Sequence, residues 1–432
     1  MKKNAAVSLK PVFLLQVLIT TVLSVFLPYR IELFLGLSLL GLAGYCAVVM
    51  AENESLPRWR KCFEGGLSLL AIVAVLILLC SHEYIFYYVS VALNLILTGI
   101  WAGLELTRVS KHATKICLSI VLCTTVLFGI FGMYSHIAYG RGAMSTLAEY
   151  ILRASKTTDE NVPAEWQELV AAGETAWSLD ESLFSKSVTA EDYNGMTVYY
   201  VNRNADYDAV VFYIHGGYYV HQAVKQQMQL MNRICEATNA MIVIPVYPLA
   251  PFHTVDDSYE NMMSLYGAIR EENNDKKLCL MGDSAGGGFS LALAEGMSDY
   301  GFRQPDELIL LSPWVDISTT NPDISDYVDI DPMLTMAMAE YSGEAWRGER
   351  EADDWHVSPL KGDLTVLKNV TIFVGTRELF YPDIMLFYDK LESTGVQNIK
   401  LHIGQGQNHV YPVYPVLEGR IATEQIIRIV RR

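Results

Sequence analysis

Residues 282–288 read Gly-Asp-Ser-Ala-Gly-Gly-Gly and directly follow a short apolar run, Leu278 to Met281. This order predicts a strand, a sharp turn and a helix, with Ser284 at the apex of the turn. Such a turn holds its serine in a strained backbone conformation, and small residues at Gly282 and Gly286 let strand and helix approach closely. The stretch therefore predicts a serine nucleophile, although alone it also fits a glycine-rich loop that cradles a phosphate.

A second stretch that could take part in catalysis is His215-Gly216-Gly217-Tyr218, directly after the apolar run 209–214. Glycines free the backbone to turn its N–H groups toward a point above the nucleophile. The N–H groups of Gly216, Gly217 and Ala285 are the expected oxyanion hole, in which a single donor is worth roughly 3 to 4 kcal/mol of barrier. An ordinary turn from strand to loop is the alternative for this stretch alone.

A serine nucleophile needs a histidine base and a carboxylate that orients the base, commonly in the chain order serine, acid, histidine. Two acids, Glu378 and Asp383, follow a predicted strand late in the chain, and His409 follows the next one. Both positions lie at the carboxyl ends of strands, where open α/β sheets place their sites. We expect His409 to be the base, whereas His402 lies inside a strand and is expected to pack.

The composition divides the chain in two. Residues 1–140 hold 10 Lys and Arg against 6 Asp and Glu, a net charge of +4, and the remainder holds 22 against 42, a net charge of −20. The first part contains five apolar runs, at 11–28, 31–50, 67–80, 84–104 and 116–134. Except for the short third run, each has a length near the roughly 20 residues that a helix needs to cross about 30 Å of hydrocarbon. A signal peptide explains only the first run. We expect a membrane domain of about five transmembrane helices over 1–140 and a globular domain over 141–432.

Basic residues gather at the N-terminus and in the loops after the second and fourth apolar runs. The positive-inside rule then predicts a cytoplasmic N-terminus, and five crossings place the globular domain on the outer face of the cell membrane. If one run failed to cross, the domain would lie on the cytoplasmic side. The charge asymmetry argues for a lipid bilayer and against nucleic acid as a partner.

The globular part alternates between strand-like and helical patterns, which predicts a mostly parallel sheet with helices on both faces. Two amphipathic helices are expected near 146–153 and 163–170. The expected strands are 197–201, 209–214, 242–246, 278–281, 308–311, 371–374 and 399–403, and the later helices 224–237, 257–271, 285–297, 383–393 and 418–430. Only Cys235 and Cys279 of the seven cysteines fall in this part, so no disulfide framework, metal site or cofactor is expected.

The chain from about residue 145 resembles the hormone-sensitive-lipase-like branch of the α/β-hydrolases, the family of bacterial acetyl esterases and arylacetamide deacetylase. The resemblance rests on several motifs in family order: HGGY at 215–218, VYPLAPFHTVDDSYE at 246–260, GDSAGGG at 282–288, SPWVDIS at 312–318, DPMLT at 331–335, SPLKGDL at 358–364, GTRELFYPD at 375–383 and NHVYP at 408–412.

The resemblance implies an acyl-ester hydrolase with Ser284 as nucleophile, Glu378 as acid and His409 as base. It also implies a helical cap built from about 141–190 and about 318–365. The chain departs from the family pattern at Tyr218, where the family has a third glycine, and at Glu378, where it usually has aspartate; Asp383 is therefore the alternative acid. The fused membrane segment is not part of the usual family domain.

Two classes of function follow. The first is a membrane-anchored serine esterase or deacylase that forms an acyl-enzyme, with a preference for short acyl chains because Tyr218 adds bulk beside the oxyanion loop. Its substrate would be a small-molecule, glycan or lipid ester, and a lipase that acts on bilayer lipids is a variant of this hypothesis. The second is a non-catalytic hydrolase-like module on a membrane sensor or transporter. Few ionisable residues fall within the apolar runs, which favours the first class.

Overall fold

The computed structural model describes residues 131–132, 134–174 and 176–431. Ser145 to Arg432 form one compact unit. The five apolar runs that we predict to cross the membrane lie outside the described residues, except for the last few positions of the fifth run. None of the helices within the described ranges has both the length and the apolar composition needed to cross a bilayer.

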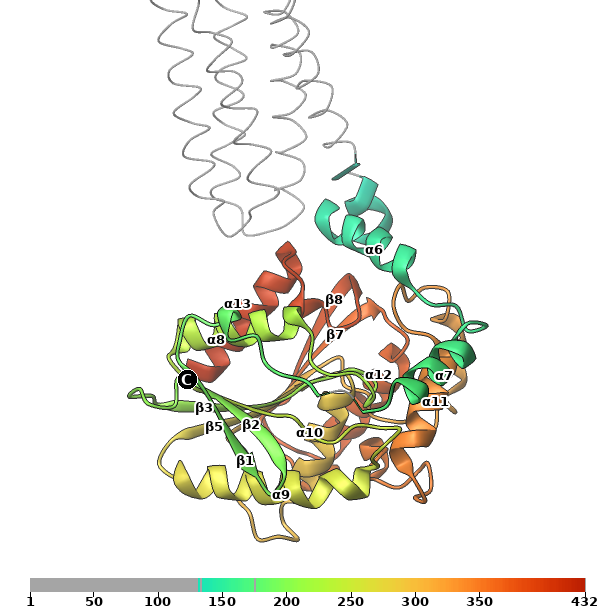
Figure 1. Ribbon diagram of the computed structural model, residues 1–432. Coiled ribbons are helices and arrows are strands. Elements are labelled where there is room, and N and C mark those ends of the chain that lie inside the picture. Colours follow the sequence, from blue (N-terminus) through green and yellow to red (C-terminus); the bar gives the residue numbers. More distant parts are fainter. Residues whose placement is uncertain (1–130, 133, 175, 432) are drawn as a thin grey trace, which may run out of the picture. The chain divides into compact units, whose positions relative to one another are not determined.

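One eight-stranded sheet organises the unit, in the order β1-β2-β4-β3-β5-β6-β7-β8 (Figure 1). The pairs β1–β2 and β2–β4 are antiparallel, and every other neighbouring pair is parallel. The expected mostly parallel sheet is thus confirmed. The strands are β1 (Val188–Tyr193), β2 (Met196–Val201), β3 (Ala209–Ile214), β4 (Met241–Pro245), β5 (Lys277–Asp283), β6 (Glu307–Leu311), β7 (Val370–Arg377) and β8 (Lys400–Asn408).

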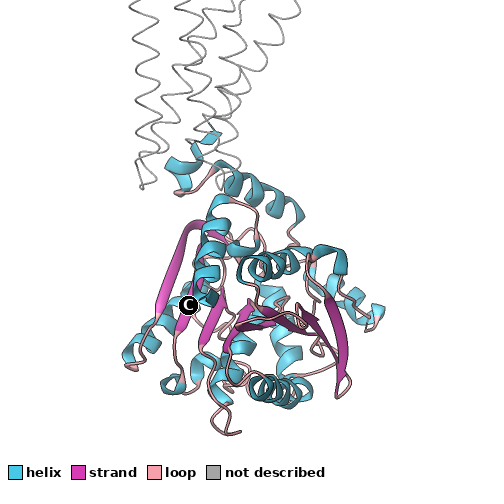
Figure 2. Ribbon diagram, turned by 90° about the vertical axis from the view of Figure 1, so that its left-hand side faces the viewer, coloured by secondary structure: helices cyan, strands magenta, loops and turns pink. Residues whose placement is uncertain are grey.

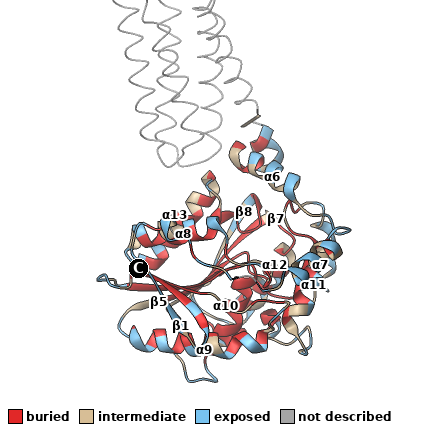
Figure 3. Cartoon of the chain, viewed as in Figure 1, coloured by how far each residue is buried: buried red, intermediate tan, exposed pale blue. Residues whose placement is uncertain are grey.

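Helices cover both faces of the sheet, and each face has its own apolar core (Figure 2). Alternate residues of β3 point into opposite cores: Phe212 belongs to one and Val211 to the other. The first core is closed by α9 (Val255–Glu272), α10 (Ala285–Gly296) and α12 (Tyr381–Ser393), and the second by α8 (Lys225–Thr238) and α13 (Leu417–Arg431). The central strands are buried along their whole length, as Figure 3 shows, because both faces are covered.

The sequence pattern missed one strand and gave no bounds for one helix. Strand β1 has an exposed or half-buried side chain at every position, so it lacks the apolar signal that marks the other strands. Helix α11 (Met336–Arg347) lies in the segment for which we expected a helical cap without bounds for its helices. Its polar and small residues gave a weak periodic signal, yet Trp346 and Ala339 on it are fully buried.

The two segments expected to form a cap contain α6 (Ala143–Ser155), α7 (Val162–Ala172) and α11. Helices α7 and α11 pack on each other, with the rings of Trp166 and Tyr341 5.5 Å apart. Figure 1 shows both beside α12, at the side of the sheet where the parallel strands end. Segments more than 150 residues apart in the sequence therefore meet there.

Candidate active site

Ser284 stands at the turn between β5 and α10, with φ 54° and ψ −124°. A backbone in this region is strained for a residue with a side chain, as expected for a nucleophile elbow. The turn is tight because a Cβ at Gly286 would lie 2.2 Å from the carbonyl oxygen of Ile214, and one at Gly282 would lie 2.2 Å from that of Gly286. Glycine at both positions thus lets α10 approach the strands closely.

The structure brings Ser284, His409 and Glu378 together in one hydrogen-bonded chain. His409 Nε2 lies 2.8 Å from Ser284 Oγ, and His409 Nδ1 lies 2.7 Å from Glu378 Oε2. All three side chains are buried, Glu378 completely. The second carboxylate oxygen of Glu378 accepts the backbone N–H of Gly375 at 3.2 Å, so both oxygens have partners and the acid has a defined orientation.

Asp383, the alternative acid, is not part of this chain. Its Oδ1 accepts a hydrogen bond from Asn321 Nδ2 at 2.7 Å. Burial raises the pKa of Asp383 to about 6. His402, expected to pack, is stacked on Phe373 with ring centroids 4.6 Å apart. His409 and Glu378 therefore belong to the hydrogen-bonded chain that ends at Ser284, whereas the contacts of His402 and Asp383 are with other residues.

The loop after β3 lies against the nucleophile, since a Cβ at Gly216 would come within 2.8 Å of Ser284 Cβ. One expectation about this loop needs correction. The N–H of Gly216 donates to Asp283 Oδ1 at 3.1 Å, so it is already engaged and is not a free oxyanion donor. The N–H groups of Gly217, Tyr218 and Ala285 have no acceptor within the described part of the chain. These three N–H groups are the ones free to face an oxyanion.

Asp283 anchors the loop to the elbow, a role that the sequence analysis missed. Its Oδ1 also accepts Tyr213 Oη–H at 2.5 Å, and its Oδ2 accepts Gln227 Nε2–H at 2.8 Å. Burial and the Asp283 carboxylate raise the pKa of Tyr213 well above its usual value, which keeps the phenol protonated as a donor. The aspartate inside the Gly-Asp-Ser motif was the available signal, but its partners come from β3 and α8 and could not be read from spacing.

Aromatic rings form a wall beside the site. Trp314 stacks on Phe380 at 5.2 Å with 8° between the planes, and Phe380 meets the His409 ring edge-on at 5.4 Å. Tyr218 packs edge-on against Trp314 at 5.7 Å, and its hydroxyl accepts the N–H of Thr335 at 3.2 Å. The Tyr218 ring, which replaces a glycine of the family pattern, is therefore held in place from two sides.

The same wall continues away from His409. Tyr219 stacks on Trp346 at 4.3 Å with 3° between the planes, and both side chains are buried. Trp346 comes from α11, so the wall joins the loop after β3 to the segment expected to form the cap.

A cleft of about 470 Å³ opens beside this loop. It lies between α7 and the residues that follow Tyr218, and His221 at its edge donates its N–H to the Gly217 carbonyl at 2.9 Å. Its walls mix apolar side chains with three glutamates, Glu165, Glu168 and Glu174. The cleft has the size of a small-molecule site, and its negative charge disfavours anionic ligands.

Among the described residues, no group of His, Cys, Asp and Glu is arranged to hold a metal ion. The two cysteines in this part, Cys235 and Cys279, are buried, and burial raises the pKa of the first to about 11 and of the second to about 12. Neither thiol is a reactive group. The reactive groups of this site are those of Ser284, His409 and Glu378.

The fold and this arrangement define an α/β-hydrolase domain of the carboxylic ester hydrolase class. Residues 211–413 match the family model described as alpha/beta hydrolase fold. The chain also shares its fold with a crystal structure of an esterase/lipase from an uncultured bacterium, with a TM-score of 0.56 and 24% identity, over 66% of this chain and 97% of that one.

Several curated relatives are named as carboxylic ester hydrolases. An esterase of Acinetobacter venetianus is 26% identical over 48% of this chain and 70% of its own length. An acetyl-hydrolase of Streptomyces hygroscopicus is 25% identical over 50% of this chain and 72% of its own length. A triacylglycerol lipase of Mycobacterium tuberculosis is 27% identical, but the match spans 46% of this chain and 41% of the lipase. Esterases, acetyl-hydrolases and lipases are thus the relatives, which sets aside a non-catalytic module.

Proposed function

We propose that this protein is a membrane-anchored serine esterase or deacylase that cleaves carboxylic esters through an acyl-enzyme. The observation that carries the proposal is the hydrogen-bonded chain from Ser284 Oγ through His409 to Glu378, built on a strained turn. Nucleophile, base and orienting acid lie within hydrogen-bonding distance before any substrate arrives. That is the preorganisation which nucleophilic catalysis needs.

The reaction follows from these contacts. Ser284 Oγ attacks the ester carbonyl carbon while His409 Nε2 takes the hydroxyl proton, and the Glu378 carboxylate stabilises the imidazolium that forms. The tetrahedral intermediate collapses as His409 returns the proton to the leaving alkoxide, which departs as the alcohol. Water, deprotonated by His409, then attacks the acyl-serine and releases the acid. No cofactor is needed for any of these steps.

The negative charge that develops on the carbonyl oxygen needs donors. We assign them to the N–H groups of Gly217 and Ala285, with that of Tyr218 beside them, because Gly216 donates to Asp283. Ala285 is the first residue of α10, so its N–H has no partner within the helix, and the positive end of the helix dipole adds to the field.

Substitution Ser284→Ala tests the assignment in the full-length protein. Hydrolysis of p-nitrophenyl acetate should fall by about a thousandfold or more, since donors and binding alone leave only a small residual rate. The thermal midpoint should stay near that of the wild type, which separates lost chemistry from lost folding. Unchanged turnover would refute the proposed mechanism.

We propose short-chain esters as substrates. Tyr218 is fixed against Trp314 and Thr335, so its bulk beside the oxyanion loop is permanent. The similarity to an acetyl-hydrolase points the same way. Comparing kcat/KM for acetyl, butyryl and decanoyl p-nitrophenyl esters checks this, and a maximum at decanoyl would instead favour a bilayer lipid.

Membrane anchoring and sidedness are part of the proposal and rest on charge and hydropathy alone. Five apolar runs with basic cytoplasmic loops would leave the acidic domain on the outer face of the cell membrane. The test is a cysteine at the exposed position Ser298 in intact cells. Labelling by an impermeant maleimide supports the outward orientation, while labelling only after lysis indicates an even number of crossings and a cytoplasmic esterase.

A further inference from the structure

Helix α6 reaches the residue that precedes the acid. Glu149 on α6 receives Arg377 Nε–H on one carboxylate oxygen at 3.0 Å and Arg377 Nη2–H on the other at 2.9 Å. This is a two-pronged ion pair, and the Glu149 side chain is only 6% exposed. Arg377 is the last residue of β7 and the immediate neighbour of Glu378. One flank of the acid is thus tied to a helix 228 positions away in the sequence.

The other flank of the acid is tied to Asp331. Leu379, directly after Glu378, donates its N–H to Asp331 Oδ2 at 2.7 Å. The other oxygen, Oδ1, accepts the N–H groups of Met333 at 2.6 Å and Leu334 at 2.8 Å. Asp331 is fully buried, and burial raises its pKa. Three N–H donors converge on this one carboxylate, which makes it a rigid hub between its own loop and the acid loop.

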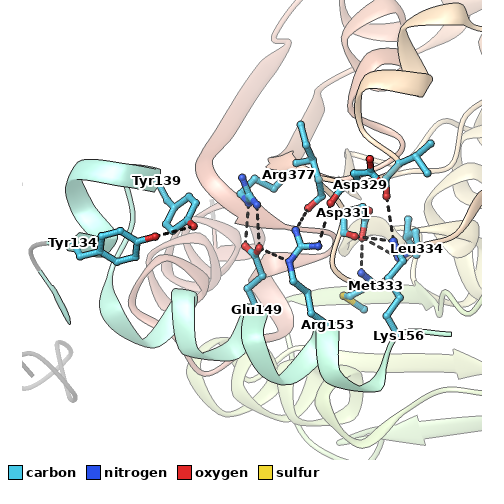
Figure 4. Close-up of polar contacts among 12 residues, drawn as sticks. Tyr134, Tyr139, Glu149, Arg153, Lys156, Asp329, Asp331, Met333, Leu334 and Arg377 are labelled. Carbon is cyan, nitrogen blue, oxygen red and sulfur yellow. Dashed lines mark hydrogen bonds and ion pairs between the residues drawn. The ribbon is translucent and has the colours of Figure 1, made fainter. Parts of the chain in front are cut away.

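Helix α6 also holds that hub. Arg153 donates to the carbonyl oxygens of Asp329 at 3.1 Å and Ile330 at 2.5 Å, and its Nε–H donates to Glu149 at 2.8 Å. Lys156, just past the end of α6, donates to the Asp331 carbonyl at 2.8 Å. Figure 4 shows Glu149, Arg153 and Lys156 extending from one side of α6 toward Arg377 and the loop of Asp331.

We infer that α6 acts as a brace that positions Glu378 for the proposed reaction. It fixes Arg377 directly and Leu379 through Asp331, so the acid sits between two anchored neighbours. The inference rests on the proposed function, because only a working acid gives the brace something to position. Glu149 and Arg377 act on Glu378 through the backbone that carries it and are positioning residues. Asp331 positions Leu379 through its hydrogen bond, and its buried carboxylate also interacts electrostatically with His409.

The contact between Glu378 and His409 tolerates little displacement of the acid. Glu378 meets His409 Nδ1 through one oxygen at 2.7 Å, and a shift of about 1 Å in such a contact can cost about a hundredfold in rate. Glutamate is one methylene longer than the aspartate usual at this position and has one more rotatable bond to restrain. A charged two-pronged pair resists lateral and rotational movement better than a single hydrogen bond. The brace therefore compensates for the longer acid.

The test uses Arg377→Gln, Glu149→Gln and the double variant in the full-length protein. Each single change should lower kcat on p-nitrophenyl acetate by about tenfold while KM stays within about twofold, because the acid is misplaced but substrate contacts remain. The double variant should be no slower than the worse single one, as expected for partners in one interaction. Arg377→Lys should recover part of kcat, since lysine keeps the charge but loses the fork.

Arg270→Gln is the matched control. Arg270 pairs with Asp306 at 2.9 Å, and in this pair, as in that of Arg377 and Glu149, one side chain is 6% exposed and the other partly buried. The pair lies near the amino end of β5, away from Ser284. This variant should lose stability without losing kcat. If Arg377→Gln and Glu149→Gln keep wild-type kcat, or if Arg270→Gln lowers it equally, the brace is refuted.

Two further measurements separate this outcome from failure of the proposed function. Ser284→Ala assayed in parallel reports whether Ser284 is the nucleophile. A normal rate in this variant would refute the proposed esterase mechanism, independently of the positioning role of α6. Asp331→Asn would set an amide N–H₂ or a weaker acceptor against the Leu379 N–H, and we expect a loss of kcat of about tenfold at unchanged KM in the folded protein. A thermal scan confirms folding, and wild-type kcat in a folded Asp331→Asn protein would contradict the role of the hub.

Discussion

Ser284 and Glu378 stand at the ends of two strands of the same sheet, yet they are held in different ways. Ser284 is fixed by its own turn, by a helix that packs directly on it, and by neighbours of Asp283 from β3 and α8. Glu378 has no comparable turn. Its neighbours are anchored by Glu149, which precedes the first strand in the sequence, and by Asp331, which lies between β6 and β7.

The difference shows what fixes the geometry of each half of the site. On the nucleophile side, a side chain in place of Gly282 or Gly286 would clash with backbone atoms, so we expect a substitution there to disrupt the turn completely. On the acid side the geometry depends on a chain of polar contacts between distant segments, so changes there should act by degrees. Close packing of the backbone therefore positions Ser284, whereas polar contacts between segments distant in the sequence position Glu378.

Replacing the acid itself should give the largest effect. Glu378→Gln keeps the shape but cannot stabilise the imidazolium of His409, so kcat should fall by about 10³- to 10⁴-fold. Asp383→Asn, on the same side and also buried, should leave kcat within about threefold, because the Asp383 carboxylate is bonded to Asn321 instead. Steady-state kinetics on p-nitrophenyl acetate gives both numbers. The opposite ranking would transfer the acid role to Asp383.

The all-or-none character of the nucleophile side is tested by Gly286→Ala. The added Cβ would lie 2.2 Å from a backbone oxygen that cannot move without the sheet, so we expect a loss of about 3 kcal/mol in the free energy of unfolding. Gly343→Ala in α11 is the matched control. Its Cβ would meet the side chain of Ile317 at 3.2 Å, and the change should stay within about 1 kcal/mol. Urea midpoints measure both, and equal losses would remove the distinction.

The smallest expected effect is a change with pH in the free energy of unfolding, caused by the Asp383 carboxyl. Burial raises the pKa of Asp383 to about 6 from its ordinary 3.8, so the folded state keeps a proton that the unfolded state loses between these values. Stability contributed by this group is therefore present below about pH 4 and lost as pH rises to 6, by about 2 to 3 kcal/mol. Asp383→Asn should be more stable than the wild type at pH 7.5 and equal to it at pH 4. Urea unfolding at both values checks this, and a constant difference would show that the carboxyl does not titrate as stated.

The sequence predicted the elements with strong periodicity and the residues that follow them. Strand β3 was found at its observed bounds, and Ser284, His409 and Glu378 were each placed at the end of the right strand. The error at Gly216 arose because a free N–H cannot be told from an engaged one without knowing where the Asp283 carboxylate points. Glu149 gave no signal at all, since a glutamate on an amphipathic helix reads as solvent-facing until its distant partner is known.

The aromatic wall has a spectroscopic consequence. Trp314 and Trp346 are fully buried and fixed in stacked, asymmetric surroundings, and Trp314 connects through Phe380 to the ring of His409. Such immobile rings give strong near-ultraviolet circular dichroism, which vanishes when tertiary packing loosens. The protein thus carries its own optical reporter of tertiary packing beside the site, and loss of this near-ultraviolet signal would show when the packing around Trp314 and Trp346 loosens.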